Sequence, residues 1–128
     1  MDDILQSLRA DVDNQQSDDG YFSLGLLIEQ ERPGLPYNIG LCRDEIEDPG
    51  CLYIEADDQI HGFTTTQARC AFDWNVLVIE WNVLVIELLD DHVFHWSGSK
   101  VVRISVPDEQ VQEVAACVPC MFPGIGGQ

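Results

Sequence analysis

Hydrophobic and polar residues alternate along much of this chain with a period of two, the pattern of β-strands that bury one face. Turn-forming runs such as Pro33-Gly34 and Ser97-Gly98-Ser99 separate the alternating segments. Residues 57–62 are expected to form a polar connection. The pattern predicts strands at residues 21–30, 37–43, 51–55, 63–73 and 100–106.

After the last of these segments the spacing becomes that of a helix. Pro107 followed by two acidic residues is typical of a first helical turn. Pro119 is expected to end this helix, because proline lacks the N–H that an inner turn needs. Its apolar stripe is formed by Val111, Val114, Ala115 and Val118. The predicted fold class is α+β, a mostly antiparallel β-sheet with a C-terminal helix packed on it.

The first 20 residues are polar and acidic and do not alternate. Four apolar residues among them have the spacing of one side of a short helix: Ile4, Leu5, Leu8 and Val12. The polar residues that follow, 11–19, are typical of a loop. The expected organisation is an acidic leader at residues 1–20, a single β-rich domain at 21–122 and a flexible tail at 123–128.

A seven-residue unit, Trp-Asn-Val-Leu-Val-Ile-Glu, occupies residues 74–80 and is repeated at residues 81–87. Its β-branched residues favour a strand. Because seven is odd and the strand period is two, one continuous strand would turn the two copies to opposite faces. We therefore expect one copy to hold the native register, with a bulge, bend or loop near Glu80 and Trp81. The alternative is a long arm that pairs with another chain and forms a homodimer.

Composition narrows the classes of partner. Six basic residues against 23 acidic residues give a net charge of −17, which disfavours nucleic acid and anionic membranes as partners. No apolar stretch has the length of a membrane span, and the N-terminal residues lack a signal-peptide pattern, so the expected compartment is the cytoplasm. The five cysteines, an odd number, are expected to be reduced thiols.

Two short motifs allow metal or redox chemistry. His92 and His95 form a His-x-x-His pair and Cys117 and Cys120 a Cys-x-x-Cys pair, spacings that suit metal ligands. A redox role is disfavoured because the cysteines lie at the predicted C-terminal end of the helix, where the helix dipole opposes thiolate formation. The other interpretation is two thiols that lie against the sheet, and no cofactor is expected.

A compact acidic cluster follows the predicted strand at residues 51–55. Glu55, Asp57, Asp58 and Gln59 place three carboxylates and an amide close together. One interpretation is a solvated turn, in which an aspartate bonds its own backbone. The other is the acidic rim of a protein-binding face, to which Asp90 and Asp91 would add.

At this cluster the sequence resembles the Immunity protein 10 family of bacterial polymorphic toxin systems. The run Glu55-Ala56-Asp57-Asp58-Gln59 is the most specific part, and Gly62 follows it at the matching place. Other segments match in pattern, in the order 21–29, 37–43 and 82–88, followed by a closing strand and a short helix after Pro107, so the resemblance covers residues 20–122. Two features depart from the family: it has room for one copy of the seven-residue unit, and it has more glycine where residues 63–66 read Phe-Thr-Thr-Thr.

The resemblance implies a protein that binds a cognate toxin and blocks it, without catalysis of its own. An acidic surface suits a toxin with a basic site, because opposite charge speeds association. The expected contact residues are Glu55, Asp57, Asp58, Gln59, Asp90 and Asp91. Two other interpretations stay open: a metal-binding or redox protein that uses His92, His95, Cys117 and Cys120, and an acidic protein whose charges only hydrate its surface.

Overall fold

The computed structural model describes residues 4–13, 21–31, 33–44, 50–75 and 80–122. Several predicted features lie outside these residues: most of the loop at 11–19, the middle of the first repeat copy, and the flexible tail at 123–128.

Within the described residues, eight strands form one sheet in the order β5-β4-β3-β2-β1-β8-β7-β6. Neighbouring strands are antiparallel except for β1 and β8, which are parallel. The strands and helices are β1 (Ile4–Asp13), β2 (Tyr21–Ile28), β3 (Asn38–Asp44), β4 (Leu52–Ala56), β5 (Asp58–Thr65), β6 (Ala68–Asn75), β7 (Glu80–Leu88), β8 (Val101–Ser105), η1 (Asp108–Gln110) and α1 (Val111–Met121). The predicted α+β class, with a mostly antiparallel sheet and a C-terminal helix, is confirmed.

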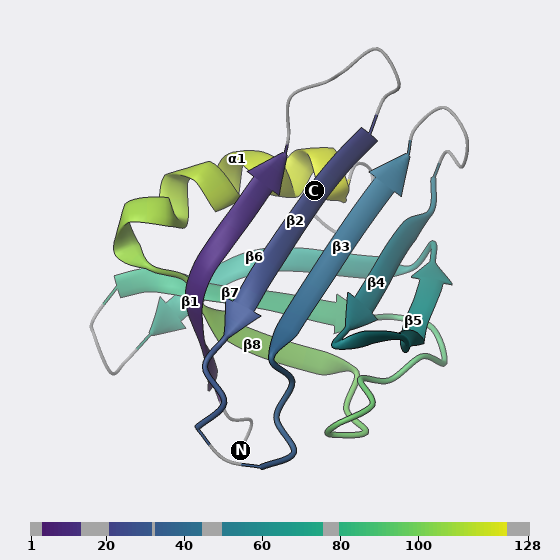
Figure 1. Cartoon of the computed structure of the whole chain (residues 1–128). Helices are drawn as coiled ribbons and strands as arrows, with labels where there is room; N and C mark the ends of the chain where they lie inside the picture. The colour runs from purple at the N-terminus through teal and green to yellow at the C-terminus, as the bar shows by residue number, and fades with distance from the viewer. Residues whose placement is uncertain (1–3, 14–20, 32, 45–49, 76–79, 123–128) are drawn as a thin grey trace.

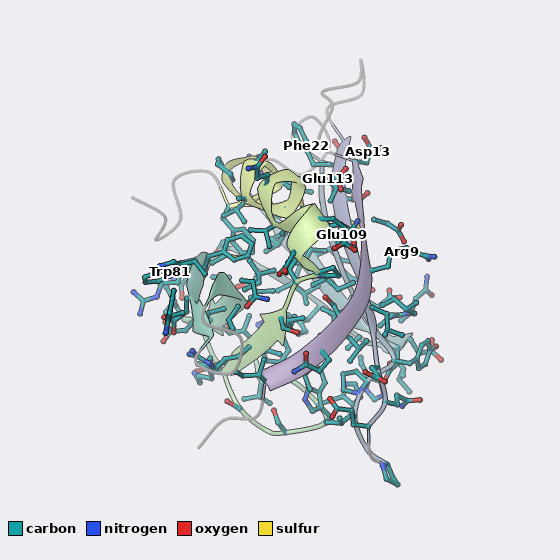
Figure 2. All side chains as sticks on the ribbon, turned by 90° about the vertical axis from the view of Figure 1, so that its left-hand side faces the viewer. Arg9, Asp13, Phe22, Trp81, Glu109 and Glu113 are labelled. Atoms are coloured by element: carbon teal, nitrogen blue, oxygen red, sulfur yellow. The ribbon has the colours of Figure 1, made fainter. Side chains whose placement is uncertain are left out.

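The sheet folds over on itself into two layers that enclose the core. Figure 1 shows β1 to β5 as the front layer and β6 to β8 crossing behind them, with α1 closing one open end. Figure 2 shows the same arrangement from the side, with side chains filling the space between the layers. The largest fully buried side chain is Phe94, which the segment between β7 and β8 inserts into this core.

Strand β1 makes the fold possible because it belongs to both layers. Its first residues pair with β8 and its later residues pair with β2. The register against β2 shifts between Ser7 and Arg9, so Leu8 is the extra residue of a β-bulge and its side chain is exposed. A bulge bends its strand, which suits the turn from one layer to the other.

The short helix predicted for the first residues is wrong, because residues 4–13 form a strand in the middle of the sheet. The bulge explains the error. Leu5 is buried before it, and Ala10 is buried after it, so the inward positions change from odd to even numbers. A strand whose phase changes at Leu8 loses its period of two and gains a spacing that resembles a helix.

The predicted C-terminal helix is present, but Pro119 does not end it. Helix α1 continues to Met121, and the N–H of Phe122 donates to the carbonyl of Val118 at 2.9 Å to close the last turn. The residues that α1 buries are Val114, Cys117 and Met121, whereas Ala115 of the predicted stripe is exposed. Burial of that face offsets the one N–H that proline lacks. In the described part of the chain, no helix is long and apolar enough to cross a membrane.

Two predictions around residues 57–73 are also wrong. The polar connection expected at 57–62 is a tight turn at Asp57 followed at once by β5, and the single strand expected at 63–73 is divided between β5 and β6. The register of β4 against β5 shifts between Ile54 and Ala56, which leaves residues 59–62 outside the regular ladder. This irregular pairing allows polar and exposed residues to occupy a strand.

The duplicated unit forms part of a hairpin rather than one long strand. The second copy lies in β7, where Leu84 and Ile86 are buried, and the first copy contributes Trp74 and Asn75 to the end of β6. The register shifts between Asp73 and Asn75, opposite Trp81, so the irregularity expected near Glu80 and Trp81 is confirmed. The long arm is not formed, and a homodimer stays a prediction.

Deletion of one copy of the unit is expected to leave the fold intact. Because the two copies are identical, deletion of either one gives the same sequence, in which a single Trp-Asn pair connects Asp73 to Val83. Asp73 and Val83 already face each other as a pair in the β6–β7 ladder. A two-residue hairpin loop can make this connection, although Trp-Asn is a poor turn sequence. We expect the free energy of unfolding to fall by about 1–3 kcal/mol, because the edge contact between Trp74 and Trp81 is lost. Urea denaturation of the resulting 121-residue chain measures this change. A chain that fails to fold would show that the duplication is needed.

Candidate protein-binding face

The predicted acidic cluster lies at the hairpin between β4 and β5. Glu55 belongs to β4, Asp57 is the turn residue, and Asp58 and Gln59 begin β5. Asp57 has a φ of 67°, in the left-handed region that few residues other than glycine adopt and that aspartate tolerates best among charged residues. The tight turn at this position leads directly into β5, whose first three residues are exposed.

Hydrogen bonds hold this turn to the start of β3. The Oδ1 atom of Asp57 accepts from the backbone N–H of Tyr37 at 2.6 Å and of Asn38 at 3.3 Å. The Tyr37 hydroxyl donates to the Asp57 carbonyl at 2.8 Å, and the N–H of Asp57 donates to the Asn38 carbonyl at 3.1 Å. The carboxylate of Asp57 is therefore used to build the turn, and the side chains that follow it, at residues 58–60, are exposed.

Glu55 is also held within the chain. Its Oε1 atom accepts from the Tyr53 hydroxyl at 2.9 Å, and this hydrogen bond, with a smaller contribution from burial, raises the pKa of Tyr53. The Tyr53 ring lies over Gly62 of β5, where an added Cβ would come within 2.0 Å of the Tyr53 hydroxyl oxygen. Gly62 is thus required for the close approach of the ring.

The segment between β7 and β8 runs antiparallel along β5. At one end, the Thr65 hydroxyl donates to Oδ2 of Asp90 at 2.6 Å. Next, the rings of Phe63 and His92 stack with their centroids 4.4 Å apart. Further along, the rings of His61 and His95 stack at 3.6 Å. Side chains of this segment therefore cover residues 61–65 of β5, which is an edge strand of the sheet.

Asp90 is a structural residue of this segment. Besides Thr65, it accepts from the backbone N–H of His92 at 3.0 Å and lies 3.0 Å from Nδ1 of His92. Desolvation by burial raises the pKa of Asp90, but the hydrogen bonds from Thr65 and His92 outweigh it and lower the pKa to about 2. Asp91 beside it is exposed. These two aspartates lie at the Thr65 end of β5, away from the turn at Asp57, so the six predicted residues do not form one cluster.

Three residues that the sequence did not single out, Tyr37, Ile60 and His61, complete the face at the turn together with His95, which the sequence offered only as a metal ligand. Ile60 is 80% exposed and Tyr37 is 47% exposed. His61 and His95 connect the turn to the β7–β8 segment, because Nε2 of His95 lies 3.6 Å from Oδ2 of Asp57. Of the three residues not singled out, Ile60 carried a sequence signal, as an isolated apolar residue in an acidic run. We call this surface the β5 face: Tyr37, Asp57, Asp58, Gln59, Ile60, His61 and His95.

The residues of the metal or redox interpretation have different neighbours in the structure. His92 and His95 contact β5, whereas Cys117 is buried in α1 close to Cys70 of β6. Burial, with a smaller contribution from Cys117, raises the pKa of the Cys70 thiol. The side chain of Cys120 lies outside the described part of the chain, and the described side chains contain no group of three or more potential ligands arranged to hold a metal ion.

A shallow groove of about 360 Å³ lies on the outer side of β6, β7 and β8. Arg69 pairs with Glu87 and Arg103 pairs with Asp73, each at 2.5 Å, along its walls. The hydrogen bond from Arg103 is the main reason that the pKa of Asp73 is lowered. Because each arginine has an acidic partner, these four side chains give the groove no net charge.

Comparisons of this chain with protein-family models, with curated proteins and with solved structures find no match. The resemblance to the Immunity protein 10 family therefore rests on the residues of the chain itself and stays a prediction.

Proposed function

We propose that this protein is an immunity protein, a non-enzymatic inhibitor that binds a cognate protein toxin in a one-to-one complex in the cytoplasm of the cell that makes both. The resemblance of residues 55–59 and Gly62 to the Immunity protein 10 family supports this function. The net charge of −17 supports a partner with a basic surface.

The observation that carries the proposal is the composition of the β5 face. Asp58, Gln59 and Ile60 are all exposed, on a turn that Asp57 fixes by hydrogen bonds to another strand. A turn that is only solvated has no need for an isoleucine that is 80% exposed beside its acids. Exposed apolar groups with a polar rim on a rigid support are the usual anatomy of a protein interface.

The chemistry of binding follows from these residues. Ile60 and Tyr37 supply apolar contact area, while Asp58 and Gln59 pair with basic and polar groups of the toxin. The remaining acidic residues act at longer range and raise the rate of encounter at low ionic strength. Occlusion of a basic site is enough for inhibition, and no chemical step is required of this chain.

The test is binding to the product of the neighbouring toxin gene, measured by titration calorimetry with both purified proteins. We expect a one-to-one complex whose affinity falls about 10-fold or more between 50 and 500 mM salt, because exposed charges are screened. Addition of one equivalent should abolish the activity of the toxin. A neighbouring protein that does not bind, or whose activity persists in the complex, would contradict the proposal.

Circular dichroism over the same range of salt separates the proposal from an acidic surface that only maintains hydration. A protein adapted in that way to high salt would need molar salt to fold. We expect a folded circular dichroism spectrum at 50 mM salt as well as at 500 mM.

A further inference from the structure

Two histidines from separate segments form a stack inside the β5 face. The rings of His61, in β5, and His95, in the β7–β8 segment, have centroids 3.6 Å apart and planes inclined by 6°. Trp96 meets the His95 ring edge-on at 5.3 Å. Such a close face-to-face contact is compatible with neutral imidazoles, whereas two protonated rings repel each other.

The charged groups around the stack come from three places. Asp57 lies 3.6 Å from His95 and Asp58 follows it in the same turn. On the segment that carries His95 are Asp90, Asp91 and His92, and Lys100 donates a hydrogen bond to the Asp90 carbonyl. Glu55 of β4 is held by Tyr53. The stack thus stands between the acids of the turn and those of the β7–β8 segment.

Protonation acts against this arrangement. Burial lowers the pKa of His95, His61 lowers it further, and Asp57 opposes them with a smaller effect. The folded state therefore takes up the proton less readily than an unfolded chain. The stability that the stack contributes is fully present above the ordinary histidine pKa near 6.5 and is lost as the pH falls below it.

The contact that the same segment makes through Asp90 responds differently to acid. The pKa of Asp90 is about 2, so its carboxylate stays ionised between pH 4 and 7 and continues to hold Thr65 and His92. Acid in this range therefore acts on the stack of His61 and His95 while the Asp90 end of the segment stays in place. The change is confined to the end of β5 that carries Asp57 and Asp58.

From this geometry we infer that the His61–His95 stack makes toxin binding by the β5 face sensitive to mild acid. The inference rests on the proposed function. Protonation places positive charge beside Asp57 and Asp58, repels a basic partner and separates the two rings. The complex is tight near neutral pH and is released below it.

The experiment compares the dissociation constant of the neighbouring toxin at pH 7.5 and 5.5 for the wild type and for the double variant His61→Phe/His95→Phe. Phenylalanine keeps a stack of the kind that Phe63 already makes with His92, but it cannot take up a proton. We expect the wild-type complex to weaken about 10-fold or more at pH 5.5 and the variant complex about 3-fold or less. Titrating groups of the toxin are common to both series, so the difference between the two ratios isolates the histidine stack.

A second arm needs no toxin and follows the imidazole protons by nuclear magnetic resonance. We expect the titration midpoint of His95 to move to higher pH in His61→Phe, because a repulsive neighbour is removed. Equal midpoints in both proteins, or equal ratios of dissociation constants, would overturn the inference while leaving binding intact. Absence of binding at pH 7.5 would overturn the proposed function itself, and with it acid-sensitive binding.

Discussion

Replacement of Asp57 by alanine is expected to lower the free energy of unfolding by about 2–3 kcal/mol. The variant loses the acceptor for the backbone N–H groups of Tyr37 and Asn38. It also places alanine at a φ of 67°, a left-handed conformation that is unfavourable for a residue with a Cβ. Aspartate tolerates this conformation better because its short polar side chain can form local hydrogen bonds. The loss should appear as a lower urea midpoint with an unchanged slope.

Two matched variants separate these causes. Asp57→Asn keeps an acceptor oxygen and tolerates the left-handed backbone, so we expect its free energy of unfolding to lie within about 1 kcal/mol of the wild-type value. Asp57→Gly removes the conformational strain but not the loss of the hydrogen bonds, and should fall between the other two variants. If alanine, asparagine and glycine were equivalent, Asp57 would not be the residue that fixes the turn.

The sequence predicts much of this fold where local pattern and tertiary structure agree. Alternation in β3, β4 and β8 places residues such as Ile39, Ile54 and Ile104 inward, and each of them is buried. It fails at β1, because the bulge at Leu8 changes the inward positions partway along the strand. It fails at β5 because that strand is held by side chains of a distant segment, which a local pattern does not contain.

The candidate site, like the fold, is predicted by the sequence only in part. The acidic run at residues 55–59 is visible in the sequence, and its exposed members lie at the turn where a partner could reach them. The pairing of His61 with His95 brings together residues far apart in the chain and depends on the antiparallel course of the β7–β8 segment. The separation of Asp90 from Asp57 likewise follows from the length of β5, and no spacing in the sequence indicates it.

The second large effect is expected at Asp58, whose side chain has no structural role comparable to that of Asp57. Asp58→Lys reverses an exposed charge in the middle of the β5 face and should weaken the toxin complex about 10- to 100-fold, because like charges then meet across the interface. Its stability should change by less than about 0.5 kcal/mol, as for most surface substitutions.

Glu113→Lys is the matched control. Glu113 is exposed at the start of α1, and Figure 1 shows that end of the helix on the opposite side of the molecule from β5. Figure 2 shows Glu113 beside Glu109 on the side that faces away from β5. The control changes the net charge of the protein by the same amount as Asp58→Lys, so it measures the long-range contribution alone.

The most direct test of binding through the β5 face is the dissociation constant of the neighbouring toxin for the wild type, Asp58→Lys and Glu113→Lys, measured by calorimetry at 150 mM salt. The account predicts that Glu113→Lys stays within about 3-fold of the wild type while Asp58→Lys is weakened at least 10-fold. Equal weakening by both variants, or no weakening by Asp58→Lys, would contradict it.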